Sequence, residues 1–239
     1  MAKAAKSEIQ SPNGADLSVQ LELVDPSVFA GSAIYSHALL AIYDWYVLGL
    51  SNLYAWRCAT RHLLALYDEC ASLRHLDIGI GTGFYLDRCK FPGSSPRITL
   101  GDLNPNCIRK VTRRISRYMP ASVLMNVFDP KTYPKGRFGS IGINYLLHCL
   151  PGPFSRKLEI LSSLKPLLAE GGVIFGSTIL GTEVKHNFFG RLLMRVYNRK
   201  GIFSNYEDNA AELEKALRTV FGNCEIELRG CVALFKARV

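Results

Sequence analysis

The feature that most constrains the fold is a regular alternation, from Leu73 onward, of short β-rich runs and helical segments. Five runs have the apolar and β-branched composition of buried strands: 73–79, 96–102, 121–127, 140–147 and 171–180. Apolar residues recur at helical spacing in three intervening segments: 85–91, 104–119 and 154–169. Strands that alternate with helices predict βαβ units and therefore a parallel sheet.

The last part of the chain departs from this alternation. Residues 209–222 predict a final helix, and residues 224–230 and 231–239 predict two strands that meet at Gly230. Two strands joined by so short a connection form an antiparallel hairpin. The complete pattern predicts a mostly parallel sheet of seven strands that closes with this hairpin.

Residues before Leu73 contain no comparable strand, only aromatic-rich helical stretches. We expect a disordered tail over 1–20, a helical cap over 21–72, and one domain over 73–239 with a lid-like insertion at 183–205. The first residues lack the apolar segment of a secretory signal. The apolar stretch 28–56 is interrupted by His37 and Asp44, so stable insertion into a membrane is not expected.

Composition excludes several classes of protein. Hydrophobic residues make up 48% of the chain, too many for a disordered protein. Lys and Arg exceed Asp and Glu by 29 to 20, which favours anionic ligands or surfaces. The seven cysteines include no Cys-x-x-Cys pair, so we expect no disulfide framework, no metal site, and reduced thiols in a cytoplasmic protein.

A glycine-rich loop follows the first predicted strand. Gly79, Gly81 and Gly83 occupy every second position before a predicted helix, a pattern that lets backbone N–H groups approach a ligand at a helix N-terminus. Such a loop also fits dinucleotide-binding proteins, and it can simply pack a helix on a strand. Asp77, directly before the glycines, would repel a pyrophosphate but could pair with an amino group.

The segment Asp77-Ile78-Gly79-Ile80-Gly81-Thr82-Gly83 resembles the first motif, acidic-x-Gly-x-Gly-x-Gly, of the class I S-adenosylmethionine-dependent methyltransferases. The resemblance covers roughly Leu73 to Val239. It implies an α/β, Rossmann-like, seven-stranded mostly parallel sheet with a C-terminal antiparallel hairpin, a helical N-terminal cap, and S-adenosylmethionine as cofactor. It also implies that Asp77 lies near the methionine amino group and that the three glycines shape the loop under the cofactor.

The second predicted strand ends at Asp102, 25 residues after Asp77. A carboxylate there can accept hydrogen bonds from both ribose hydroxyls of a nucleoside. The alternative is that Asp102 caps the next helix, a role that Asn104 could already fill. The resemblance adds Leu103 as a neighbouring cofactor contact.

Further cofactor contacts are implied by the resemblance alone. Family members carry a polar residue that reads the adenine amino group beside an apolar wall, which selects Asp129 and Phe128 after the third strand. Asn144, at the end of the fourth strand, is a further predicted contact. A Tyr-Asp pair on a preceding helix often covers the methionine end of the cofactor, which selects Tyr43.

His148 is the predicted catalytic residue. It lies in a Leu-Leu-His sequence that resembles the fourth-strand ending of many small-molecule methyltransferases, at the sheet edge where open α/β sheets bind ligands. Its imidazole could act as a base or only orient the acceptor. A histidine among leucines can also be structural.

The predicted function is methylation of a small, aromatic or apolar, secondary-metabolite-like acceptor at O, N or C. The main alternative is an RNA or protein methyltransferase that docks through basic helices, such as the face formed by Arg109, Arg113 and Arg117 or the stretch 185–200. An Asn-Pro-Pro-Tyr type of motif is missing, so a nucleic-acid partner is not expected. A further alternative is a non-methylating protein that repurposes the fold. The sequence leaves the oligomeric state open.

Overall fold

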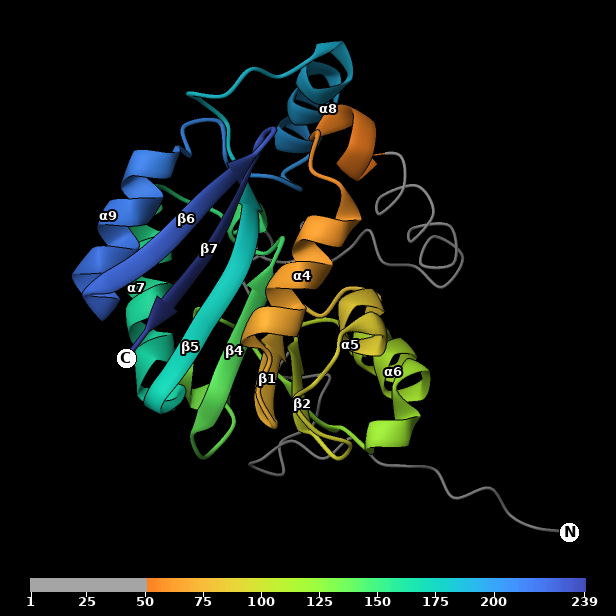
Figure 1. Ribbon diagram of the computed structural model, residues 1–239. Helices are drawn as coiled ribbons and strands as arrows, with labels where there is room; N and C mark the ends of the chain where they lie inside the picture. Colours follow the sequence, from red (N-terminus) through yellow and green to blue (C-terminus); the bar gives the residue numbers. More distant parts are fainter. Residues whose placement is uncertain (1–50) are drawn as a thin grey trace, which may run out of the picture.

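The computed structural model describes residues 51–239, and at its centre lies a twisted seven-stranded sheet (Figure 1). The strands follow one another in the order β3-β2-β1-β4-β5-β7-β6. Their bounds are β1 Arg74–Ile78, β2 Arg97–Asp102, β3 Ala121–Leu124, β4 Phe138–Asn144, β5 Leu168–Ile179, β6 Asn223–Arg229 and β7 Val232–Arg238.

Six strands run in the same direction and only β7 runs opposite to them, which agrees with the predicted mostly parallel sheet that closes with an antiparallel hairpin. β1 is central to the parallel part, where Leu76 lies between Thr99 of β2 and Ile141 of β4. β7 runs antiparallel to both β5 and β6, and the turn between β6 and β7 contains Gly230 at φ +60°. The predicted fold class is therefore confirmed, including the closing hairpin.

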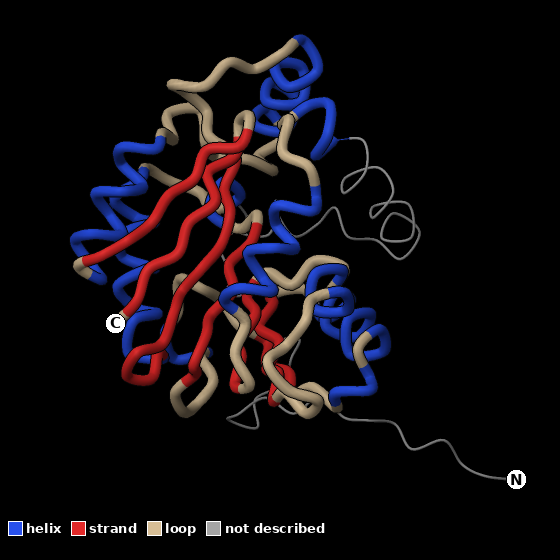
Figure 2. Tube along the Cα trace, viewed as in Figure 1, coloured by secondary structure: helices blue, strands red, loops and turns tan. Residues whose placement is uncertain are grey.

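Helices cover both faces of the sheet (Figures 1 and 2). α4, α5 and α6 lie on one face, α7 and α9 lie on the other, and α8 stands at the end of the sheet where the parallel strands finish. The helices are α4 Thr60–Cys70, α5 Phe84–Arg88, α6 Pro105–Arg114, α7 Phe154–Leu164, α8 Phe188–Arg199 and α9 Ala210–Phe221. Short 3-10 helices are η2 Ser116–Tyr118, η3 Pro130–Thr132, η4 Leu147–Cys149 and η5 Lys165–Leu167.

Two apolar layers hold these helices to the sheet. Because side chains alternate along a strand, Leu76 and Ile78 of β1 enter the layer shared with α7 and α9. His75 and Asp77, which alternate with Leu76 and Ile78 along β1, face the α4 side instead. Two polar side chains are thereby buried under α4.

The segment before α4 differs from the sequence prediction. The predicted helical cap over 21–72 implies helix here, but a helical turn at 51–55 is followed by Arg57 at φ +54°, and α4 begins only at Thr60. Although α4 falls within the predicted cap, it packs against β4, β5 and β7. The predicted tail at 1–20 and most of the predicted cap lie outside the described residues.

Within residues 51–239, no helix has the length and apolar character needed to cross a membrane. The same residues contain no group of three or more His, Cys, Asp or Glu side chains placed to hold a metal ion.

Candidate functional site

The carboxyl ends of β1, β2 and β4 meet at one edge of the sheet, and the glycine loop begins there. Gly79 N donates to Gly101 O of β2 and Gly83 N donates to Ile80 O, both at 2.9 Å. Gly79, Gly81 and Gly83 have φ values of +70°, +52° and +72°, a region that side-chain-bearing residues rarely adopt. The loop conformation therefore depends on glycine at all three positions.

The surroundings of the three glycines differ. A Cβ on Gly79 would lie 2.9 Å from Leu146 Cδ1, and one on Gly83 would lie 2.6 Å from Val111 Cγ1. A Cβ on Gly81 would meet no described atom within 4 Å. Packing of helix on strand thus accounts for Gly79 and Gly83, whereas Gly81 borders open space that a ligand can enter.

Asp77 is the next-to-last residue of β1, below this loop, and is only 3% exposed. Its Oδ2 accepts hydrogen bonds from the Tyr67 hydroxyl at 2.7 Å and from His75 Nε2 at 3.1 Å. Burial, followed by the nearby Asp77 carboxylate, raises the pKa of Tyr67 well above its usual value, so the hydroxyl keeps its proton and donates it. Neither of these two bonds uses Asp77 Oδ1.

Asn144 ends β4 beside Asp77. Its side chain is buried, and neither the amide oxygen nor the amide nitrogen has a hydrogen-bond partner at normal geometry in the described residues. The amide is nevertheless close enough to Tyr67 to lower the pKa of that hydroxyl slightly against the larger effect of burial. Buried polar groups without partners are uncommon, so this amide fits a role in holding a ligand.

Asp102 ends β2. Its Oδ1 accepts a hydrogen bond from Asn104 N at 2.8 Å. Burial raises the pKa of Asp102 to about 6, and the backbone N–H groups of Asn104 and Ile80 oppose that rise. The cap of α6 is Asn104, whose side chain accepts from Asn106 N at 2.9 Å. Asp102 is therefore not the helix cap, and Leu103 lies directly beside it in the loop.

Phe128 and Asp129 lie in the loop after β3, and each has a local structural contact. Asp129 caps η3 by accepting from Lys131 N at 3.0 Å. The Phe128 ring lies 4.3 Å from the guanidinium carbon of Arg156. These contacts leave adenine recognition by either residue a prediction. Tyr43, the predicted contact from the cap, lies outside the described residues.

His148 lies in η4 and is 3% exposed. Its Nδ1 accepts a hydrogen bond from Ile179 N at 3.3 Å, and its ring meets the Phe203 ring edge-on at a centroid distance of 4.5 Å. Burial, and then the positive charge of Lys157, lower the pKa of His148 to about 3. The imidazole is therefore neutral near pH 7, with its proton on Nε2.

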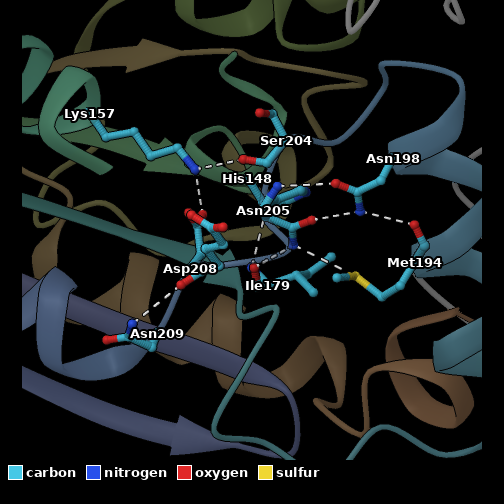
Figure 3. Close-up of polar contacts among 10 residues, drawn as sticks. His148, Lys157, Ile179, Met194, Asn198, Ser204, Asn205, Asp208 and Asn209 are labelled. Carbon is cyan, nitrogen blue, oxygen red and sulfur yellow. Dashed lines mark hydrogen bonds and ion pairs between the residues drawn. The ribbon is translucent and has the colours of Figure 1, made fainter. Parts of the chain in front are cut away.

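The segment that packs over His148 is held by a buried ion pair (Figure 3). Lys157 of α7, with a fully buried side chain, pairs with Asp208 and donates to Ser204 O at 3.0 Å. Ser204 N in turn donates to His148 O at 2.8 Å. Burial lowers the pKa of Lys157 and raises that of Asp208, while the attraction between them opposes both shifts.

Asn205 completes this arrangement from the β5 side (Figure 3). Its side-chain nitrogen donates to Ile179 O at 2.8 Å, and its side-chain oxygen accepts from Asn198 Nδ2 of α8 at 3.0 Å. The end of β5, α8 and the segment before α9 are thus tied together around His148. α8 and this connection fall within the insertion predicted at 183–205, whose lid-like role stays a prediction.

A cavity of about 700 Å³ opens between α8 and the loop after β5. Lys185, Arg191 and Arg195 line it together with Met194 and Tyr206. In the described part of the chain none of these three cations is paired with a carboxylate. The cavity therefore has a positive electrostatic character and an apolar wall.

The other basic stretch, on α6 and the following η2, is partly neutralised. Arg114 Nε lies 3.2 Å and Arg117 Nη1 2.6 Å from the Asp87 carboxylate of α5. These two bonds lower the pKa of Asp87 against the opposing effect of its burial, and fix the arginines to the protein. Of the three arginines in the face predicted for docking, this leaves Arg109 and Arg113.

Several residues at this edge were not predicted from the sequence. Tyr67, His75, Lys157 and Asp208 are buried polar groups whose partners include residues of other segments of the chain. His75 alone had a sequence signal, since it precedes Asp77 by two residues and so shares its strand face. The other three become neighbours only through tertiary packing.

Comparisons with known proteins show which enzymes this chain is similar to. The chain is 37% identical over 215 residues to demethylluteothin O-methyltransferase of Streptomyces thioluteus, which covers 90% of this chain and 94% of the relative. It is 41% identical over 209 residues to the physcion biosynthesis cluster O-methyltransferase of Aspergillus chevalieri, which covers 87% and 94%. No protein-family model matches the chain.

Solved structures share the fold at low sequence identity. The complex of DhpI with S-adenosylhomocysteine (SAH) superimposes with a TM-score of 0.62 at 16% identity, covering 90% of this chain and 98% of that one. PigF with SAH gives a TM-score of 0.55 at 20% identity, covering 74% and 55%.

Proposed function

We propose, from the premise that the chain belongs to the class I S-adenosylmethionine-dependent methyltransferases, that it methylates a hydroxyl oxygen of a small aromatic or apolar molecule. S-adenosylmethionine is its cofactor and supplies an electrophilic methyl carbon bound to a sulfonium. The observation that carries the oxygen assignment is that two relatives matching most of the chain, at 37% and 41% identity, are both named O-methyltransferases. Their names also place them in the synthesis of specialised metabolites.

The residues at the sheet edge fit this cofactor. We assign the ribose hydroxyls to Asp102, the amino group to Asp77 Oδ1, and a further polar contact to the unpartnered amide of Asn144. The backbone at Gly81 would pass under the ligand, because nothing in the described residues occupies the space beside it. The adenine contacts from Phe128 and Asp129 and the cap contact from Tyr43 remain part of the proposal.

Methyl transfer depends chiefly on the alignment of the reacting atoms. Transfer needs the acceptor oxygen, the methyl carbon and the sulfur in line within a site that excludes water. His148 can assist as a hydrogen-bond donor through Nε2, since its Nδ1 lone pair already accepts from Ile179 N. Of the two roles that the sequence left open, this geometry favours orientation of the acceptor over proton abstraction.

The positive cavity beside α8 supports an acceptor with an acidic hydroxyl. Lys185, Arg191 and Arg195 would favour the ionised form of a phenol or enol held near them, while Met194 and Tyr206 offer apolar contact. An oxygen that ionises through its own acidity needs no protein base. This is consistent with a His148 whose pKa is too low for that role at neutral pH.

The test is turnover with matched acceptors. The full chain is incubated with methyl-labelled S-adenosylmethionine and a series of aromatic compounds that carry a phenol, an aniline or a thiophenol on the same ring system. We expect methylated phenols, identified by mass spectrometry, with one SAH formed per methyl group transferred. Gly81→Val is the control, because a side chain there projects into the open space.

Products methylated only at nitrogen or sulfur would contradict the oxygen assignment. SAH binding without turnover of any small acceptor, together with methylation of RNA or protein, would contradict the small-molecule assignment.

A further inference from the structure

Asp77 is the end of a buried chain of hydrogen bonds that reaches away from the glycine loop into the layer beneath α4. Ser140 of β4 accepts from Ser72 N and lies within hydrogen-bond distance of His75 Nδ1, both at 2.8 Å. His75 Nε2 then lies 3.1 Å from Asp77 Oδ2, which also accepts from Tyr67. His75 and Ser140 have no exposed surface.

The direction of each bond follows from what each group can donate. An ionised carboxylate only accepts, so the bond to Asp77 Oδ2 requires the proton of His75 to be on Nε2. In the neutral ring His75 Nδ1 is then an acceptor, and the hydroxyl of Ser140 can donate to it instead of to Ser72 Oγ, which lies 3.0 Å away. Every member of the chain is satisfied in this arrangement, and two donors converge on a single oxygen of Asp77.

Aromatic packing fixes the two donors in place. The Tyr67 ring stacks on Tyr85 at 5.2 Å and meets the edge of Phe175 at 5.1 Å. The His75 ring packs against Phe175 at 5.7 Å and against Phe91 at 6.2 Å. Neither donor can rotate away from Asp77 without disturbing several buried rings, so the direction of the carboxylate is set by the core.

The neighbouring strand makes room for this pair. A Cβ on Gly142 of β4 would lie 2.8 Å from Asp77 Oδ2 and 3.2 Å from His75 Cε1. Glycine at this position therefore allows the contact between His75 and Asp77.

We propose that Tyr67 and His75 are positioning residues for the cofactor: by holding Asp77 Oδ2, they present Oδ1 to the amino group of the methyl donor. The proposal rests on the assignment of Asp77 to that amino group under the proposed function. Two residues outside the glycine motif, one on α4 and one on β1, thereby determine how well the motif carboxylate binds.

The test compares two ligands that differ in the amino-acid part. SAH carries the amino group, whereas 5′-methylthioadenosine has the same adenosine and lacks the amino acid. We expect Tyr67→Phe and His75→Leu to weaken SAH binding about tenfold in calorimetry, because each removes a hydrogen bond to a charged group. Binding of 5′-methylthioadenosine should change by less than about twofold.

Two further variants separate positioning from general damage. His75→Gln keeps an N–H donor in place of Nε2 and should recover most of the SAH affinity. Tyr118→Phe removes a hydroxyl on η2, away from Asp77, and should bind both ligands as the wild type does. In turnover, Tyr67→Phe should raise the KM for S-adenosylmethionine and leave kcat unchanged at saturating cofactor.

The outcomes distinguish this inference from the proposed function. Unchanged SAH affinity in both Tyr67→Phe and His75→Leu would overturn the inference, and so would an equal loss for both ligands, which indicates a disturbed fold. A wild type that binds 5′-methylthioadenosine and SAH equally would instead contradict the assignment of Asp77 to the amino group. If His75→Leu does not fold, Tyr67→Phe and His75→Gln still decide the question.

Discussion

Asp102 ends β2, and His148 lies in η4 after β4. Burial favours the neutral form of both side chains. Burial raises the pKa of the Asp102 carboxyl to about 6 and lowers that of the His148 imidazole to about 3. For Asp102, ribose binding needs the charged form, so a ligand must overcome this tendency. For His148, the neutral form is the one that can donate from Nε2 while Nδ1 accepts.

The first prediction concerns Asp102. Because its pKa is raised above the ordinary carboxyl value, the free protein carries a proton there below about pH 6. We expect SAH affinity, measured by calorimetry, to weaken as the pH falls through about 6. Asp102→Asn should bind more weakly at pH 8 by roughly 1.5–3 kcal/mol and show a flatter pH dependence. Equal affinity of both proteins at pH 8 would remove Asp102 from the ribose site.

The second prediction concerns catalysis by His148. An imidazole with a pKa of about 3 stays neutral from pH 5.5 to 8.5, so it contributes no acid limb to the rate in that range. We expect the ratio of kcat/KM between the wild type and His148→Asn to be constant across it. A ratio that falls as the pH drops through 6.5 would identify His148 as a base after all.

Protonation of His148 also affects the stability of the fold. Its pKa in the folded state lies below the ordinary value of 6.5, so the unfolded chain binds the proton more readily. The contribution of neutral His148 is therefore complete above pH 6.5 and is lost as the pH falls toward 3. Urea unfolding at pH 7 and pH 5 should show a smaller loss in His148→Asn than in the wild type.

At the scale of elements, local periodicity was enough to predict most strands and helices. The five parallel strands, α6, α7, α9 and the hairpin follow from apolar spacing because each buries one continuous face. Periodicity did not predict the break at Arg57, since a single residue at positive φ changes no spacing. The same limit applies to the ion pair of Lys157 and Asp208, whose members are 51 residues apart.

The third prediction concerns that ion pair. Lys157→Met leaves Asp208 buried and unpaired, so the free energy of unfolding should fall by about 3–5 kcal/mol in urea at pH 7. The double variant Lys157→Met, Asp208→Leu removes both charges and should recover much of the loss. A double variant no more stable than Lys157→Met would mean that the cost arises from packing. Glu214→Gln, which breaks an exposed pair with Arg218, should change stability by less than about 1 kcal/mol.

The residues of the candidate site also differ in how far the sequence alone predicts them. The glycine loop and Asp102 were predictable because a known motif and a strand end identify them in the sequence. The partners of Asp77 were not, because Tyr67 comes from a helix and its hydroxyl reaches the carboxylate only after α4 packs on the sheet. The sequence therefore indicates candidate ligand contacts more readily than it indicates the groups that hold them in place.

At the scale of the whole molecule, ligand binding should report on the fold class. The fourth prediction is that SAH at a hundred times its Kd raises the free energy of unfolding by about 2.7 kcal/mol, which thermal unfolding detects as a higher Tm. NAD at the same concentration should have no effect, because Asp77 would repel its pyrophosphate. Gly81→Val should not respond to SAH. Stabilisation by NAD in place of SAH would contradict the cofactor assignment.

The position of β7 has a consequence for how the chain is made on the ribosome. β7 lies between β5 and β6, yet it is synthesised after both of them. A nascent chain that has reached Gly230 has finished all five parallel strands, but β5 still exposes a bare edge and β6 has no strand to pair with. The sheet can be completed only when residues 232–238 leave the exit tunnel and insert between two strands already made. Until then the chain exposes an unpaired edge of β5, which makes this state prone to aggregation and a target for chaperones.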